Sequence, residues 1–211
     1  MSRDADNGFM RQAIALAWTG FGATRPNPVV GCILVRDGAI LSQGVTQAGG
    51  RPHAEEQALA ALGGDAEGAE AFVTLEPCGA RSSGAPSCSE RLVSAGVRRV
   101  VIAWEDRSTL ASGLGAERLR AQGVTVETGL LADEAAPLYL GYDHRLRTGR
   151  PLVAEADDGA GCEAMFAPQP GEDLALALLR YGAEGYSRLW TPKDGDLARA
   201  LLRHGFLHRG R

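Results

Sequence analysis

Three side chains near the middle of the chain have the chemistry of a zinc site. His53 opens the sequence His53-Ala54-Glu55, Cys78 follows Pro77, and Cys88 comes later in the chain. One imidazole and two thiolates are ligands that zinc accepts, and three protein ligands leave the fourth position of a tetrahedron open. An open zinc site lowers the pKa of bound water to about 7, which makes hydroxide available as a nucleophile. The pattern therefore predicts catalytic zinc held by His53, Cys78 and Cys88.

Glu55 lies two residues from the first ligand and is not needed to complete the ligand set. If Glu55 shares the first turn of a helix with His53, its carboxylate lies beside the metal-bound water. Hydrolytic deamination of an amidine-like ring needs a group that protonates the ring nitrogen and later the leaving ammonia, and one carboxylate can do both. We therefore expect Glu55 to be the catalytic proton shuttle. The alternative is a non-catalytic protein that binds zinc for stability, or binds a pyrimidine or a partner as a regulator, and it would have no use for Glu55.

The elements expected around these residues alternate between strands and helices. Apolar residues recur at helical spacing in some segments, and β-branched apolar runs bounded by turn residues mark others. The expected elements are a helix at 9–17, hairpin strands at 29–35 and 39–45 joined by Asp37-Gly38, a helix that begins at His53, a strand at 71–75, a helix capped by Ser87 or Ser89, and a further strand-helix-strand-helix run through 149. This alternation predicts an α/β fold, a three-layer sandwich with a mixed central sheet between helices.

The composition changes after residue 155. Residues 156–171 are rich in Gly, Pro and Ala, which is typical of a linker or of an ordered loop that crosses the surface. Residues 172–211 predict a short helix-strand-helix appendage that is too small for an independent core and is expected to dock on the main domain or on another subunit. The predicted organisation is therefore a zinc-dependent deaminase domain at 1–155, a linker, and this appendage.

Several segments of the chain match one known family. The sequence His-x-Glu followed by Pro-Cys-x-x-Cys is the signature of zinc nucleobase deaminases, but here nine residues separate the two cysteines. The further matching segments lie at 24–32, 72–78, 95–103 and 147–151. With them, the chain resembles the deaminase domain of the bifunctional deaminase/reductase of riboflavin biosynthesis, a branch of the cytidine-deaminase-like superfamily whose insertion between the cysteines is usually one residue shorter.

The resemblance implies a zinc-dependent deaminase of a (phospho)ribosylaminopyrimidine, with water as the only other reagent. It implies that Asn27 contacts the substrate, although Asn27 could also be an ordinary turn residue between two prolines. Thr46 stands where the family has a histidine, and the loop at 79–84 replaces a His-x-Gly-Lys/Arg-Thr-type stretch that lines the pocket. Arg81 in this loop is a candidate substrate contact, or else a solvated loop charge. These departures leave open a deaminase repurposed for another nucleobase-like amine.

The bifunctional family continues with a reductase of dihydrofolate-reductase type. Residues 173–209 vaguely resemble the end of that domain, as a degenerate remnant would. We expect no reductase activity, since this length leaves no room for a nucleotide-binding sheet.

Other residues that could join such a site have simpler roles open to them. Glu76, just before Pro77, is expected to bond the backbone and steady the cysteine loop. Cys32 lies in an apolar strand and is expected to pack there as a small hydrophobe. Cys162 would convert the zinc into a closed, structural site if it reached the metal. Surface or packing roles are expected for the remaining histidines, which are His144, His204 and His208.

The overall charge argues against some classes of partner. The formal net charge is −4 and the pI is about 5.6, so no basic surface is expected that would neutralise a nucleic-acid backbone. No apolar run is long enough to cross a bilayer, and the first residues lack a signal pattern, so we expect a cytoplasmic protein with no membrane partner. The expected partner is a small heterocyclic amine. A homodimer stays open, because members of the resembled family often pair.

Overall fold

The structure is a computed structural model that describes residues 2–81, 83–108 and 113–208. Its internal contacts divide the chain into two units. The first comprises Met1–Thr24 with Val29–Leu138, and the second comprises Arg25–Pro28 with Tyr139–Arg211. One long helix, α5 (Ala132–Thr148), contributes residues to both units.

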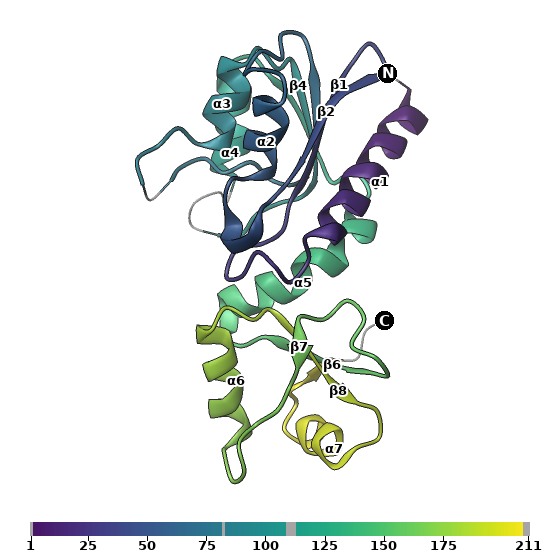
Figure 1. Cartoon of the computed structure of the whole chain (residues 1–211), viewed down its shortest axis with the longest axis vertical. Helices are drawn as coiled ribbons and strands as arrows, with labels where there is room; N and C mark the ends of the chain where they lie inside the picture. The colour runs from purple at the N-terminus through teal and green to yellow at the C-terminus, as the bar shows by residue number, and fades with distance from the viewer. Residues whose placement is uncertain (1, 82, 109–112, 209–211) are drawn as a thin grey trace. The chain divides into compact units, whose positions relative to one another are not determined.

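The first unit is built on a mixed sheet of five strands in the order β2-β1-β3-β4-β5 (Figure 1). The pairs β1–β2 and β1–β3 are antiparallel, whereas β3–β4 and β4–β5 are parallel. The strands are β1 (Gly31–Arg36), β2 (Ala39–Val45), β3 (Glu70–Leu75), β4 (Arg99–Trp104) and β5 (Thr125–Thr128). All six residues of β3 are buried, as expected for a central strand covered on both faces.

Helices cover both faces of this sheet. One face carries α1 (Arg3–Thr19), whose buried stripe includes Met10, Ala13 and Ala17, and the ring of Phe9 lies 5.3 Å from that of Phe72 in β3. The other face packs against α2 (Ala54–Ala60), α3 (Cys88–Ser94) and α4 (Leu114–Ala121) in one hydrophobic cluster. The predicted three-layer α/β/α sandwich is therefore confirmed.

Two glycines let helices approach the sheet at backbone distance. A Cβ built on Gly31 of β1 would lie 2.1 Å from the carbonyl oxygen of Ala13 in α1. A Cβ on Gly44 of β2 would lie 2.1 Å from the carbonyl oxygen of Ala54, the first residue of α2. No side chain fits at these distances. Gly44 therefore lets the first turn of α2, which begins directly after His53, pack against the backbone of β2.

The hairpin turn agrees with its sequence signal. Asp37 and Gly38 both have positive φ, 52° and 80°, which is what a two-residue type I′ turn requires. The turn joins β1 to β2 as predicted, and it places Gly31 opposite Val45 in the antiparallel register.

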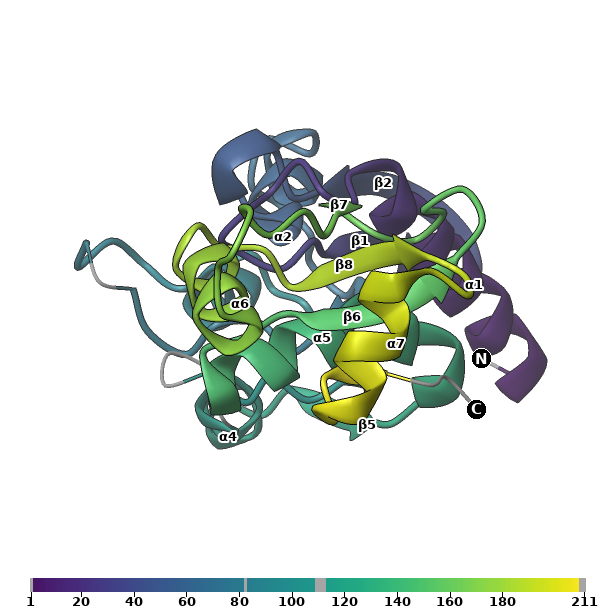
Figure 2. The same cartoon turned by 90° about the horizontal axis from the view of Figure 1, so that it is seen from below.

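The second unit has its own parallel sheet in the order β7-β8-β6-β9. Figure 2 shows β6 and β8 side by side, with α6 and α7 beside them. Its elements are β6 (Leu152–Ala156), β7 (Ala164–Met165), α6 (Leu174–Ala183), β8 (Arg188–Pro192), α7 (Asp196–Arg203) and β9 (Leu207–His208). A separate core contains Val153, Phe166, Leu178, Leu189 and Leu201.

The strand β6 differs from the organisation expected from the sequence. We expected residues up to 155 to belong to the deaminase domain and residues 156–171 to be a linker. Instead, β6 pairs with β8 and β9, and Phe166 within the expected linker is buried in the core of the second unit. The helix-strand-helix segment gains a core because β6, β7 and Phe166 supply the apolar surface that it lacks by itself.

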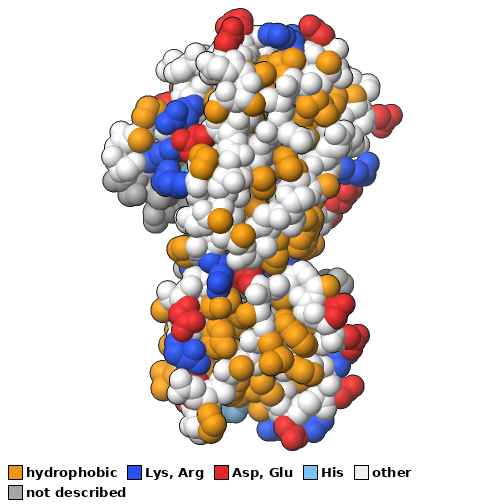
Figure 3. All heavy atoms as spheres, in the orientation of Figure 1, with side chains coloured by type: hydrophobic (Ala, Val, Ile, Leu, Met, Phe, Trp, Pro, Cys, Tyr) orange, Lys and Arg blue, Asp and Glu red, His pale blue; other side chains and the backbone are white. Residues whose placement is uncertain are grey.

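The surface carries charges of both signs. On the face drawn in Figure 3, acidic and basic side chains are interspersed, and no basic stripe crosses it. Among the described residues, no helix is both long and apolar enough to span a membrane.

Candidate active site

The three predicted ligands come from three different positions on the first unit. His53 is the N-cap residue of α2, Cys78 follows the end of β3 after Glu76 and Pro77, and Cys88 is the first residue of α3. Because β3 is a parallel neighbour of β4, its carboxyl end lies at the edge of the sheet where ligands usually bind in open α/β sheets. The fold therefore brings together residues that are 35 positions apart in the chain.

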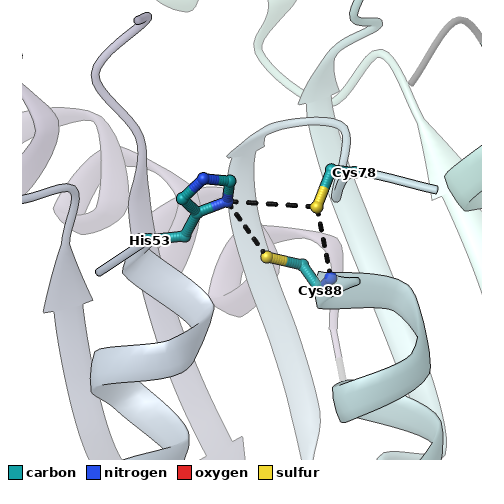
Figure 4. Close-up of side chains that lie close together, drawn as sticks. All are labelled: His53, Cys78 and Cys88. Carbon is teal, nitrogen blue, oxygen red and sulfur yellow. Dashed lines mark hydrogen bonds between the residues drawn. The ribbon is translucent and has the colours of Figure 1, made fainter. Parts of the chain in front are cut away.

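The ligand atoms of these residues converge (Figure 4). Nδ1 of His53 lies 3.3 Å from Sγ of Cys88 and 4.0 Å from Sγ of Cys78, and all three atoms lie within 4.8 Å of one another. At zinc bond lengths of about 2.3 Å to sulfur and about 2.0 Å to nitrogen, tetrahedral ligand atoms lie roughly 3.5–3.8 Å apart. The donor set and its spacing therefore fit a zinc ion with one position left for water.

Hydrogen bonds link the two cysteines. The backbone N–H of Cys88, at the start of α3, donates to Sγ of Cys78 over 3.2 Å. A hydrogen bond from the Cys88 thiol lowers the pKa of Cys78, and the same bond together with burial raises the pKa of Cys88. Zinc binds cysteines as thiolates, so a cation held here would displace protons from the two sulfurs.

Glu55 lies in the first turn of α2, two residues after the ligand His53, and its side chain is buried. The residue is only 3% exposed, and burial raises the pKa of its carboxyl group. Its electrostatic partners are His53 and Cys78, and Cys88 is a hydrogen-bonding neighbour. A buried carboxylate next to three metal-ligand atoms can hold and transfer a proton there.

Hydrogen bonds fix the cysteine loop at both ends. Ser87 caps α3: its hydroxyl accepts from the N–H of Glu90, and the Glu90 carboxylate accepts from the N–H of Ser87. Ser89 donates from its hydroxyl and from its N–H to the carbonyl of Cys78. The first of the two predicted caps is thus the real one, and Ser89 instead ties one ligand to the helix of the other.

Glu76 bonds the backbone, as expected. Its carboxylate accepts from the N–H groups of Gly113 and Ala116 at the start of α4, each over 3.0 Å. Next to it, a Cβ on Gly115 would lie 1.8 Å from the carbonyl oxygen of Pro77. The chain leading into Cys78 is therefore held against α4 by side chain and by backbone contact.

The positions of Arg81 and Glu56 add a feature that the sequence did not predict. Glu56 accepts a hydrogen bond from the backbone N–H of His53, and it forms an ion pair with Arg81. Arg81 also donates to Sγ of Cys88. The Glu56 bond to His53 is a capping box, for which the sequence signal is an acidic residue three positions after the cap.

The other predicted positions have the following surroundings. Thr46 is buried, and its hydroxyl accepts from the N–H of Val30. Asn27 belongs to the segment Arg25–Pro28 of the second unit, in which the guanidinium of Arg25 stacks on Tyr186. Cys32 is fully buried in the core of the first unit. Among the described residues, the ligand cluster consists of His53, Cys78 and Cys88 and does not include Cys162.

Comparisons with known proteins agree with this geometry. Residues 3–104 match the family model described as the cytidine and deoxycytidylate deaminase zinc-binding region. The riboflavin biosynthesis protein RibD of Escherichia coli is 41% identical over 167 residues, which are 79% of this chain and 45% of the relative. The diaminohydroxyphosphoribosylamino-pyrimidine deaminase of Buchnera aphidicola is 39% identical over 143 residues, which are 68% of this chain and 97% of the relative.

Solved structures give the same assignment. The structure of Acinetobacter baumannii RibD aligns with a TM-score of 0.67 at 40% identity over 81% of this chain and 48% of that one. The deaminase/reductase of Thermotoga maritima aligns with a TM-score of 0.68 at 34% identity over 82% of this chain and 49% of that one. The chain thus spans about half the length of the Escherichia coli, Acinetobacter and Thermotoga relatives and nearly all of the Buchnera deaminase. The chain belongs to the family of zinc-dependent diaminohydroxyphosphoribosylaminopyrimidine deaminases of riboflavin biosynthesis.

Proposed function

We propose that this protein hydrolytically deaminates a ribosylaminopyrimidine of the riboflavin pathway at the site formed by His53, Cys78 and Cys88. The observation that carries the proposal is the convergence of these three ligand atoms within 4.8 Å, next to the buried carboxylate of Glu55. A structural zinc site would have a fourth protein ligand and no use for that carboxylate.

His53, Cys78 and Cys88 hold the metal through Nδ1 and the two Sγ atoms. A zinc ion with an open coordination position supplies acidified water as a nucleophile near neutral pH. The Cys88 N–H bonds the Cys78 sulfur and the Ser89 hydroxyl bonds the Cys78 carbonyl, and both bonds hold Cys78 at the start of α3. The site is thereby preorganised for one small cation.

Glu55 is the proton carrier in this proposal. The overall reaction consumes one water molecule, replaces the exocyclic amine of the ring by an oxygen, and releases ammonia. The Glu55 carboxylate takes one proton from water and delivers it to the ring nitrogen. It then takes the second proton from the hydroxyl group added to the ring carbon and delivers it to the leaving amine, so a single group acts as base and as acid. Its burial supports this role, because a proton held there is not exchanged freely with solvent.

The substrate is inferred from the relatives. The Buchnera relative is named a diaminohydroxyphosphoribosylamino-pyrimidine deaminase, and the chain covers 97% of it. Within this proposal Asn27 contacts the substrate, the first unit carries the deaminase activity, and the second unit has no reductase activity. All four cysteines are free, which supports a reducing, cytoplasmic location. A homodimer is part of the same proposal.

The test is ammonia release by the zinc-loaded chain from the phosphorylated ribosylaminopyrimidine, its dephosphorylated form and other aminopyrimidines. Glu55→Gln should reduce kcat by about 10²–10⁴-fold, the usual contribution of a general acid-base group, without loss of bound zinc. Glu117→Gln is the matched control, since Glu117 also lies in the first turn of a helix but is exposed. Turnover by Glu55→Gln at the wild-type rate would refute the catalytic role.

A second candidate is a deaminase of another nucleobase-like amine. It is favoured by Thr46, which stands where a histidine is expected and whose hydroxyl is engaged by the Val30 N–H. Turnover of another aminopyrimidine, together with none of the phosphorylated compound, would favour this candidate. Zinc binding without turnover of any of them would favour a binding protein.

A further inference from the structure

Arg81 occupies a position that does not suit a solvated loop charge. Its side chain is only 4% exposed, although it lies in the loop between the two cysteines. Two of its nitrogens are engaged: Nη1 donates to Oε1 of Glu56 over 2.9 Å, and Nη2 lies 2.8 Å from Oε2 of the same carboxylate. A buried guanidinium paired in this two-pronged way leaves little surface for a substrate phosphate.

The same guanidinium reaches a metal-ligand atom. Nη2 of Arg81 donates to Sγ of Cys88 over 3.4 Å. Its partner Glu56 also accepts from the backbone N–H of His53 over 2.9 Å. One arginine therefore connects Cys88 at the start of α3 with His53 at the start of α2 through a chain of three hydrogen bonds.

Stability alone does not explain why Arg81 is held there. Its Nε is buried and has no hydrogen-bond partner in the described part of the chain. A buried, unsatisfied donor costs about 1–3 kcal/mol, and buried ion pairs are often no more stabilising than apolar residues of similar volume. A local cost of this kind is typical of a functional site.

We propose that Arg81 is a positioning residue of the metal centre, which holds the Cys88 sulfur and, through Glu56, the His53 backbone in the geometry that zinc requires. This inference rests on the proposed zinc site and replaces the predicted substrate contact for Arg81. Hydrogen-bonded partners of metal ligands orient them, and their loss typically weakens metal affinity by about 10–100-fold.

The test is the zinc affinity of the full chain in the absence of substrate, measured by competition with a chromophoric chelator. Arg81→Gln should weaken zinc binding by about 10–100-fold. Arg81→Lys should give an intermediate loss, because an ammonium group keeps the charge but cannot hold the sulfur and both carboxylate oxygens as a planar fork does. The absorption of the cobalt-loaded variants, which reports thiolate coordination, should change in the same order.

Arg91→Gln is the matched control. Arg91 also pairs with Glu56, over 3.4 Å, but its side chain is 38% exposed, and no bond from it to either cysteine sulfur is present among the described residues. We expect its zinc affinity to stay within about twofold of wild type, as for most exposed ion pairs.

A double-mutant cycle tests the chain of bonds itself. If Arg81 and Glu56 support the zinc site through the same hydrogen bonds, their effects should not add. The double variant Arg81→Gln/Glu56→Gln should then lose no more zinc affinity than the weaker-binding single variant. Zinc affinity of Arg81→Gln within twofold of wild type, with a raised KM, would overturn the proposal and restore the substrate contact. Should Arg81→Gln fail to fold, unchanged zinc affinity in Arg81→Lys would overturn it equally. Because the zinc-affinity measurements use no substrate, a wrong substrate assignment would leave their result unchanged.

Discussion

Buried charged groups are paired differently at the amino ends of β3 and β4 and at the carboxyl end of β3. At their amino ends, Glu70 and Arg99 are register partners, and Arg99 also bonds Asp6 of α1 and Glu127 of β5. At the carboxyl end of β3, Glu55 lies near His53 and the two cysteines, and the buried cation Arg81 bonds Cys88 and Glu56. In the first cluster each of the three carboxylates accepts a hydrogen bond from Arg99, whereas in the second two thiols and the Glu55 carboxylate gather around one point.

This difference separates a structural network from a functional one on the same pair of strands. Carboxylates and guanidinium groups that satisfy each other need nothing from outside. A cluster of two thiols and a buried carboxylate becomes favourable when a divalent cation joins it. The charged groups at the amino ends of β3 and β4 therefore contribute to stability, and those at the carboxyl end of β3 to zinc binding. Each role can be tested separately.

Removal of a metal ligand should give the largest effect. Cys78→Ser should bind far less zinc than one ion per chain and lose deaminase activity by at least about 10³-fold, since several kcal/mol of metal-assisted stabilisation disappear. Metal analysis after gel filtration measures the first effect and ammonia release the second. Cys162→Ser is the control and should keep its zinc. Equal zinc loss in both variants would instead indicate a closed site with four protein ligands.

Removal of the central arginine at the amino ends should cost stability and leave zinc in place. Arg99→Met should lower the free energy of unfolding by about 3–5 kcal/mol, because it removes the cation that pairs with the buried carboxylate of Asp6 and leaves Glu70 with only the exposed Arg98. Urea denaturation measures this loss. The control is Arg98→Met, whose side chain is 55% exposed and whose pair with Glu70 should contribute less than about 1 kcal/mol. A similar small loss for Arg99→Met would contradict the structural role.

The pH dependence of stability should follow from Glu70. Burial alone would raise the pKa of Glu70, but hydrogen bonds and charges from Arg98 and Arg99 outweigh burial and lower it. A carboxylate with a lowered folded-state pKa stabilises the protein above its unfolded pKa of about 4.3, and this contribution is lost as the pH falls through the folded-state value.

The stability difference between wild type and Arg99→Met should therefore narrow as the pH falls from 6 to 3. Denaturant titrations across this range measure the difference, and metal release largely cancels because both proteins carry the same zinc site. A difference that stayed constant with pH would show that Arg99 acts through packing and not through charge.

The smallest expected effect concerns the cap of α3. Ser87→Ala removes the hydroxyl that accepts from the Glu90 N–H, and it should cost about 1 kcal/mol of unfolding free energy. Ser94→Ala, at the exposed end of the same helix, should change stability by less than about 0.5 kcal/mol. If Ser87→Ala also released the zinc, the cap of α3 would belong to the zinc-binding network as well as to the stability of the helix.

The ligand set was predictable from the sequence because its signals are local. His53 and Glu55 are two residues apart, the Asp37-Gly38 turn requires positive φ, and periodic apolar runs mark the strands. These features gave the layered fold and the metal residues. The roles of Glu55, Asn27 and the other site residues in turnover stay predictions.

The long-range features were not predictable in this way. Arg81 lies among small turn-forming residues, where no periodicity indicates that the side chain turns inward to Glu56 and Cys88. The short apolar run of β6 does not specify which sheet it joins, and its pairing with β8 depends on residues more than thirty positions away. Such pairings depend on three-dimensional proximity that neither propensity nor spacing encodes.

Gly115 should be as intolerant of substitution in protein engineering as a catalytic residue. With the Pro77 carbonyl only 1.8 Å from where its Cβ would be, any substitution must displace the segment that leads into Cys78. Gly79 faces the same crowding, 2.7 Å from the Cβ of Leu114. A saturation library screened for turnover should therefore show two intolerant positions that take no part in the reaction, and attempts to shorten or graft this loop onto another scaffold must carry the α4 glycine with it.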